Sequence, residues 1–274
     1  MKVVAVGECT IDRYPALGAE RVGGISLNFA VHAREAGAES VLLVSCTGDD
    51  RAAATVRHRL ATAGIDASRV HERPGATASQ RIELAADGER VFPPGGYDPG
   101  VLADFRLDAA DLAAIRDADV VAVPVFRQLM PLVESVVCEP RPRMLRVADL
   151  LDGEDLGSGF AGLDPLLETF DVLFLSGASS LVDRLSDHTR GARGTLVLTH
   201  GAAGATALVR GERTFVPAEP VPRAECVDST GCGDAFQAAC TVHLARGSDV
   251  GTALRAGAQR AARVIRHLGG TVPA

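Results

Sequence analysis

The sequence predicts an α/β fold, with a central, mostly parallel sheet and helices on both of its faces. Short apolar runs rich in β-branched residues recur along the chain, and stretches with helical periodicity lie between several of them. Strands that are apolar throughout are typical of parallel sheets that helices cover on both sides. The 274 residues, 47% of them hydrophobic, show no composition shift that divides the chain, so we expect 1–274 to form a single domain.

Five apolar runs are the expected buried strands, and four stretches are the expected helices around the candidate site. The strands are expected at 3–7, 40–45, 119–125, 171–176 and 194–200, and the helices at 27–37, 51–64, 233–246 and 250–267. In the first helix Phe29, Ala30, Ala33 and Ala36 fall on one face. The first two helical patterns both run into a glycine, as helix C-termini often do.

Residues 76–92 depart from this order. Apolar and charged side chains alternate there, and Asp87-Gly88 is a strong signal for a hairpin turn. Both faces of this ribbon are mixed, because Ile82 and Leu84 alternate with Arg81 and Glu83. The segment is therefore either a surface ribbon without a function or a lid over a ligand.

The overall charge and the apolar runs exclude some partners. A net charge of −7 argues against a nucleic acid or an anionic membrane surface as partner, but local backbone donors still allow an anionic substrate. No apolar run reaches the roughly 18 residues of a spanning helix, and the first residues lack the features of a secretory signal. We therefore expect a cytoplasmic protein. The six cysteines show no C-x-x-C spacing, which favours buried free thiols.

Lysine is nearly absent, and this limits the possible chemistry. Lys2 is the only lysine in the chain. A Walker P-loop needs a lysine after its glycine-rich turn, and a pyridoxal enzyme needs an internal lysine for its Schiff base. If the protein handles nucleotides, it must bind their phosphates in another way.

The sequence Gly231-Cys232-Gly233-Asp234 stands directly before an expected helix. Glycines allow backbone angles with which successive N–H groups can form a concave anion site, and the helix N-terminus adds further free donors. Such a site could stabilise negative charge on a transferring group. Asp234 is either a helix cap or a base that takes a proton from an attacking hydroxyl, and the spacing favours neither.

Two other segments accompany this turn. "THGAAG" at 199–204 places a threonine hydroxyl and flexible backbone at a strand end, where α/β sheets often bind ligands. Near the start of the chain, Asp12 follows the first strand, and Gly23-Gly24 and Asn28 come at a helix start. Asn28 is either a helix cap or one of three groups, with Asp12 and Gly24, that bind a polyol through its hydroxyls.

Taken in order, these motifs resemble those of the ribokinase-like carbohydrate kinases, the PfkB family. "DSTGCGDAF" (228–236) is similar to the family motif D-T-x-G-A-G-D, with Ser229 and Cys232 as substitutions. "GGISLN" (23–28) is similar to G-G-x-x-x-N, and "TGDD" (47–50) and "THGAAG" match as well. The resemblance covers most of the chain. Segments 11–18 and 95–107 look most like the fructoselysine 6-kinase branch.

The resemblance implies a ribokinase-like fold and an ATP-dependent kinase that phosphorylates a hydroxyl of a sugar or a fructosamine. It implies Asp234 as the base and the backbone of Gly231, Cys232 and Gly233 as the anion hole. The implied sugar ligands are Asp12, Gly23, Gly24 and Asn28, and the implied nucleotide contacts are Thr199, Gly201, Gly204 and Asp228. A small β lid from about 9–25 and 76–93, also a possible homodimer contact, would cover the sugar. Mg²⁺ is the implied metal, and a monovalent cation is a further possibility.

One departure from the family leaves the metal ligands unknown. The family's N-x-x-E motif corresponds to "LSGASS" (175–180), where Ser176 and Ser179 replace the asparagine and the glutamate. Magnesium could be held through the ATP phosphates, with help from Asp149 or Asp152. The missing glutamate motivates an alternative function, a non-catalytic sugar or nucleotide sensor on the same scaffold.

A nicotinamide-dependent oxidoreductase is a third interpretation. "GSGFAG" (157–162) satisfies G-x-G-x-x-G. It follows an acidic stretch instead of a strand, so a dinucleotide would lack the strand-turn-helix cradle it needs.

Overall fold

The central sheet has nine strands within residues 1–140 and 144–272, the parts of the chain that the computed structural model describes. Their order is β15-β14-β13-β12-β11-β10-β1-β4-β5, and every neighbouring pair from β13 to β5 is parallel. β14 is antiparallel to both of its neighbours. The strands are β1 (Lys2–Val6), β4 (Ser40–Thr47), β5 (Asp66–Glu72), β10 (Val120–Pro124), β11 (Leu145–Asp149), β12 (Val172–Ser176), β13 (Thr195–Thr199), β14 (Ala205–Val209) and β15 (Glu212–Val216).

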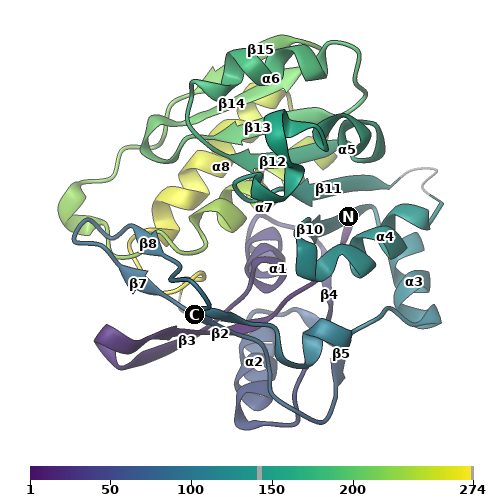
Figure 1. The fold of residues 1–274 in the computed structure, drawn as a ribbon, viewed down its shortest axis with the longest axis vertical. Helices are drawn as coiled ribbons and strands as arrows, with labels where there is room; N and C mark the ends of the chain where they lie inside the picture. The colour runs from purple at the N-terminus through teal and green to yellow at the C-terminus, as the bar shows by residue number, and fades with distance from the viewer. Residues whose placement is uncertain (141–143, 273–274) are drawn as a thin grey trace.

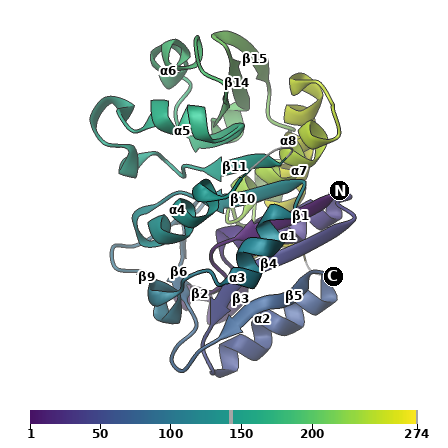
Figure 2. The ribbon, with the colours of Figure 1, turned by 90° about the vertical axis from the view of Figure 1, so that its right-hand side faces the viewer.

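Helices cover both faces of this sheet, which confirms the predicted fold class (Figures 1 and 2). One layer holds α1 (Ile25–Glu35), α2 (Arg51–Thr62), α7 (Cys232–Ala245) and α8 (Val250–Val264). The other holds α3 (Ala109–Arg116), α4 (Met130–Cys138), α5 (Leu163–Thr169) and α6 (Leu181–Thr189). The Pro/Arg-rich sequence of residues 138–144 predicts a connecting loop, and this segment lies partly outside the described residues.

The two layers enclose separate hydrophobic clusters, and β1 contributes to both. Val3 and Ala5 pack in the cluster with α1, α7 and α8, whereas Val4 and Val6 pack in the cluster with the helices of the other layer. Successive strand side chains point to opposite faces, so a strand buried on both faces must be apolar at every position. This is why β1, β4, β10, β12 and β13 could be recognised in the sequence as continuous apolar runs.

A second sheet of four strands lies at the carboxyl end of β1. Its order is β3 (Ala19–Gly23), β2 (Thr10–Tyr14), β6 (Ser79–Arg81) and β9 (Tyr97–Asp98). The turn expected at Asp87-Gly88 is present in a short hairpin of β7 (Glu83–Leu84) and β8 (Arg90–Val91). Residues 79–81 are not part of that hairpin, because β6 pairs in parallel with β2. Figure 1 shows β2, β3, β7 and β8 together on one side of the molecule.

Two expectations from the sequence concern the cysteines, expected as buried free thiols, and the apolar runs, expected to be too short for a membrane-spanning helix. All six cysteines are free, and Cys9, Cys46 and Cys240 are buried, but Cys138 is exposed. The expectation of buried thiols therefore holds for only part of the set. None of the helices in the described residues combines the length and the apolar character that crossing a bilayer requires.

Candidate active site

A cavity of about 420 Å³ opens between the carboxyl ends of the parallel strands and the second sheet. β1 lies between β10 and β4, so the strand order reverses on either side of it. Ligands of open α/β sheets bind at such a reversal, beyond the carboxyl ends of the strands. The wall includes Asp12, Gly24, Asn28, Gly231, Gly233 and Asp234, which the sequence analysis selected from distant segments.

The start of α7 forms one side of this cavity and leaves backbone donors free. Gly231 has φ 76°, and a Cβ there would lie 2.3 Å from the Cα of Gly270, so only glycine fits. Cys232 N–H donates to the Ser229 carbonyl at 3.2 Å, but the N–H groups of Gly231, Gly233 and Asp234 have no acceptor among the described residues. Free N–H groups at the positive end of a helix dipole favour an anion.

Asp234 does not cap α7. It lies inside the first turn, and no side chain caps this helix. Its Oδ2 accepts a hydrogen bond from Asn28 Nδ2 at 2.8 Å. Burial raises its pKa to about 7, with a further rise from Asp149 and opposing effects of Asn28 and Arg90. A buried carboxyl group with a pKa near neutrality is suited to act as a general base.

Asp12 is the second buried carboxyl group that the sequence analysis placed here. Its Oδ1 accepts from the Thr10 hydroxyl at 2.8 Å. Burial raises its pKa to about 7, and the charges of Glu8, Asp234 and Asp228 add to this effect. Gly23 makes room for it, since a Cβ at Gly23 would lie 1.9 Å from Asp12 Oδ2.

Asn28 is not a helix cap, which decides one alternative that the sequence left open. α1 begins at Ile25 with Gly24 as its N-cap residue, so Asn28 lies inside the helix. Gly24 has φ 98°, and a Cβ there would lie 2.9 Å from Cys9 Cα. The two glycines therefore let α1 start close to β2, and this brings the Asn28 amide to Asp234.

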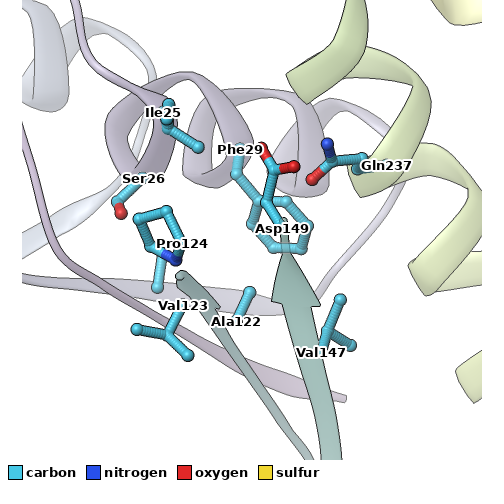
Figure 3. A pocket seen from close by; sticks show the side chains of 10 residues that line it. Ile25, Ser26, Phe29, Ala122, Val123, Pro124, Val147, Asp149 and Gln237 are labelled. Atoms are coloured by element: carbon cyan, nitrogen blue, oxygen red, sulfur yellow. The ribbon is translucent and has the colours of Figure 1, made fainter. Parts of the chain in front are cut away.

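The cavity also contains acidic residues that the sequence analysis missed or could not place. Glu8 comes two residues after the end of β1, and Asp149 is the last residue of β11. Figure 3 shows the Asp149 carboxylate at the end of its strand, close to Gln237 of α7. Burial raises the pKa of Asp149, while hydrogen bonds from Gln237 and the Leu151 backbone lower it. For Glu8 the available sequence signal was its position directly after the predicted strand at 3–7.

Comparison with known proteins decides the family of this site. The model of the "pfkB family carbohydrate kinase" matches residues 1–139 and 171–274. The chain belongs to this family. As a member it is a phosphotransferase, a sugar kinase, which confirms the resemblance seen in the sequence.

Named relatives and solved structures agree with this assignment. The kinase is 28% identical to fructoselysine 6-kinase of Escherichia coli strain K12, over 98% of this chain and 99% of that protein. It is 25% identical to fructosamine kinase FrlD of Bacillus subtilis strain 168, over 96% and 90%. The fold matches a putative ribokinase II from E. coli, solved in complex with ATP and Mg²⁺, with a TM-score of 0.79 at 19% identity, over 98% and 94%.

Asp228 lies behind the cavity wall of the kinase and is fully buried. Its carboxylate accepts hydrogen bonds from the Tyr14 hydroxyl at 2.7 Å, from Thr230 N–H at 2.8 Å and from Gly269 N–H at 2.8 Å. The Asp228 carboxylate, which the resemblance assigned to the nucleotide, thus already accepts three hydrogen bonds from the protein itself. We therefore interpret Asp228 as a residue that holds the loop before α7 in place.

The three other residues assigned to the nucleotide are absent from the cavity wall. Thr199 ends β13, and its hydroxyl lies 3.1 Å from that of Ser176, which does line the cavity. Gly201 is exposed in the next turn. Gly204 has φ 111°, and a Cβ there would lie 2.3 Å from the Val216 carbonyl, so the fold itself requires this glycine.

The dinucleotide-type sequence has the wrong setting for a Rossmann site. Residues 157–162 contain one short 3-10 turn, Ser158–Phe160, and the residues that lead to α5, after a loop that follows β11. No strand precedes this glycine pattern directly and no long helix begins from it. It therefore offers no phosphate cradle of the strand-turn-helix type.

Proposed function

We propose that the kinase transfers the γ-phosphoryl group of ATP to a hydroxyl of a sugar or a fructosamine of the fructoselysine type. The single observation that carries this proposal is that Asp234 and free backbone N–H groups lie on the same cavity wall. Asp234 supplies a base with a pKa of about 7, and the N–H groups of Gly231 and Gly233 supply an anion site. The names of the E. coli and B. subtilis relatives support a fructosamine as acceptor.

In this proposal Asp234 takes the proton of the attacking hydroxyl as that oxygen attacks phosphorus. Asn28 holds the carboxylate in place through its 2.8 Å hydrogen bond. Asp12 and the backbone at Gly24 hold other hydroxyls of the sugar. The N–H groups at the start of α7 stabilise the charge on the transferred group, and phosphoryl transfer depends mainly on such positioning and charge stabilisation.

The residues present also fit a magnesium ion, although the family's glutamate is missing. Carboxylate and phosphate oxygens and water are the ligands that Mg²⁺ prefers. Asp149 and Asp152 place two carboxyl groups on the cavity wall, and the Asp149 residue is buried. These two residues would hold the ion, which supplies charge neutralisation on the triphosphate. A lid closing over the sugar and a homodimer through that lid remain predictions.

The test is a panel of acceptors in an assay of ADP release with ATP and Mg²⁺. The panel holds fructoselysine, fructose, ribose, a nucleoside and fructose 6-phosphate, each with the wild type and with Asp234→Asn. ADP release with a sugar or fructosamine, abolished in the variant, supports the proposal. Calorimetric binding of a panel member without any ADP release would instead identify a sugar sensor.

A further inference from the structure

The cavity wall has an acidic character that a neutral sugar does not explain. Among the residues that line it are six carboxyl groups and a single guanidinium group. The carboxyl groups are those of Glu8, Asp12, Glu89, Asp149, Asp152 and Asp234, and the guanidinium group is that of Arg90. Four of these carboxyl groups belong to buried residues: Glu8, Asp12, Asp149 and Asp234. Like charges held together without water favour a cationic ligand.

Glu8 has an unused acceptor in this wall. The residue is 6% exposed, and its Oε1 accepts from Ile25 N–H at 3.2 Å. Its Oε2 and the hydroxyl of Tyr97 are both buried, and the Tyr97 hydroxyl acts on the Glu8 carboxyl group as a hydrogen-bond donor that lowers its pKa. Neither atom has a partner with full hydrogen-bond geometry in the described residues, and buried polar atoms are nearly always well paired, so this pair can still accept from a ligand group in the cavity.

We propose that Glu8, with the Tyr97 hydroxyl, binds a protonated amino group of the acceptor substrate. The kinase would thereby select amine-bearing sugars over neutral sugars and sugar phosphates. This inference rests on the proposed function, because it concerns the acceptor of that same reaction. An ammonium group has donors only, and both the carboxylate and the phenol oxygen accept. A hydrogen bond between two charged groups is about twice as strong as a neutral one.

A sugar phosphate is a poor match for the same wall. A phosphate group would need basic side chains, but Arg13, Arg21 and Arg81 in the strands of the second sheet do not line the cavity. Arg13 pairs with Glu20 at 3.4 Å and Arg81 with Glu83 at 2.7 Å, on the exposed side of the lid strands. Arg90 alone lines the cavity, and its guanidinium lies 3.4 Å from the Ser229 carbonyl at the loop before α7. The acceptor end of the cavity therefore lacks a phosphate site.

The electrostatics of the wall agree with a bound cation. Burial raises the pKa of Glu8, and the charge of Glu8 in turn raises the pKa values of Asp12 and Asp234. A cation beside Glu8 would oppose each of these effects. An amine-bearing acceptor would then favour the ionised form of Asp234, the form that accepts the proton.

The test compares acceptors with and without a positive charge at the sugar. Fructoselysine carries a secondary ammonium there, its ether analogue, with oxygen in place of that nitrogen, keeps nearly the same shape without the charge, and fructose lacks the group. Glu8→Gln keeps the size of the side chain and removes its charge. Glu168→Gln is the matched control, because it is the same substitution at an exposed residue of α5 that does not line the cavity.

We expect the wild type and Glu168→Gln to prefer fructoselysine over both neutral acceptors by at least about 10-fold in kcat/KM. Glu8→Gln should lose about 10- to 100-fold in kcat/KM with fructoselysine, mainly through KM, and less than about 3-fold with fructose. Equal losses with charged and neutral acceptors, or a wild type that prefers fructose 6-phosphate, would overturn the inference.

Calorimetric titrations separate this inference from the proposed function. Fructoselysine that binds the wild type, but binds Glu8→Gln at least about 10-fold more weakly, supports the ammonium site even if no acceptor releases ADP. Absence of ADP release rejects the proposed reaction alone. Equal affinity of both proteins for fructoselysine rejects the ammonium site alone.

Discussion

Replacing Asp234 with asparagine should abolish catalysis and at the same time stabilise the folded protein. The carboxyl group has a pKa of about 7, against an ordinary value of 3.8. Below 3.8 the group is protonated in both the folded and the unfolded states and does not affect stability. Between 3.8 and about 7 the unfolded state ionises first, so stability falls as pH rises, and the loss is complete above about 7.

The size of both effects follows from the site. At 1.36 kcal/mol per pKa unit, the difference between 3.8 and about 7 sets a ceiling of about 4 kcal/mol for the cost of Asp234 at pH 8. Asparagine has nearly the same shape and carries no charge, and its carbonyl can still accept from Asn28. A general base contributes about 10²- to 10⁴-fold to the rate, so we expect kcat to fall by that factor.

Two measurements check this prediction. Thermal unfolding should give Asp234→Asn a Tm several degrees above that of the wild type at pH 8, with a smaller difference at pH 5. ADP release with the best acceptor should show the loss of kcat, and calorimetry should show the acceptor still binding. A variant with normal turnover would remove Asp234 from the mechanism. A variant less stable at pH 8 would show that its charge is compensated in the folded state.

Three further predictions follow from the loop before α7 and from the buried base. In the wild type, kcat/KM should rise with pH and level off above an apparent pKa near 7, and a rise centred near 4 would contradict the pKa of Asp234. In urea titrations, Gly231→Ala should lower the free energy of unfolding by about 2–4 kcal/mol, because its Cβ would clash with Gly270. Gly233→Ala should fold normally in the same titrations, because its Cβ would meet no atom within 4 Å. Asp228→Asn should cost about 2–3 kcal/mol in the same titrations, since its three donors lose a charged acceptor, and an unchanged midpoint would contradict the structural role.

Local chemistry made the start of α7 predictable from sequence. Gly231 needs a positive φ and Gly233 leaves the cavity open, and both requirements act within one turn of the chain. The hydrogen bond from Asn28 to Asp234 joins residues 206 positions apart, and residue spacing contains no information on such a contact. The family resemblance supplied that grouping. The structure then excluded the helix-cap interpretation of both side chains.

Other features lay beyond what a local pattern can show. β11 was not expected, because the buried Arg146 interrupts the apolar run that marks the other parallel strands. The hairpin prediction at 76–92 failed for residues 79–81, because pairing with β2 is a long-range choice between strand partners. Glu8 was missed since a single acidic residue after a strand is common, and only the cavity shows that its side chain has an unpaired oxygen.

Hydrogen bonds join the second sheet and its neighbouring hairpin to the loop before α7, so the proposed lid and the proposed anion site are linked directly. The Tyr14 hydroxyl of β2 donates to Asp228, and Ser229 N–H donates to the Gly88 carbonyl in the turn of the lid hairpin. The backbone N–H of Arg90 donates to the Ser229 hydroxyl at 2.9 Å. A shift of the lid must therefore move or release the loop that presents the α7 amides. Closure over the sugar and assembly of the anion site are thus expected to occur together, which would keep phosphoryl transfer to water low while the acceptor is absent.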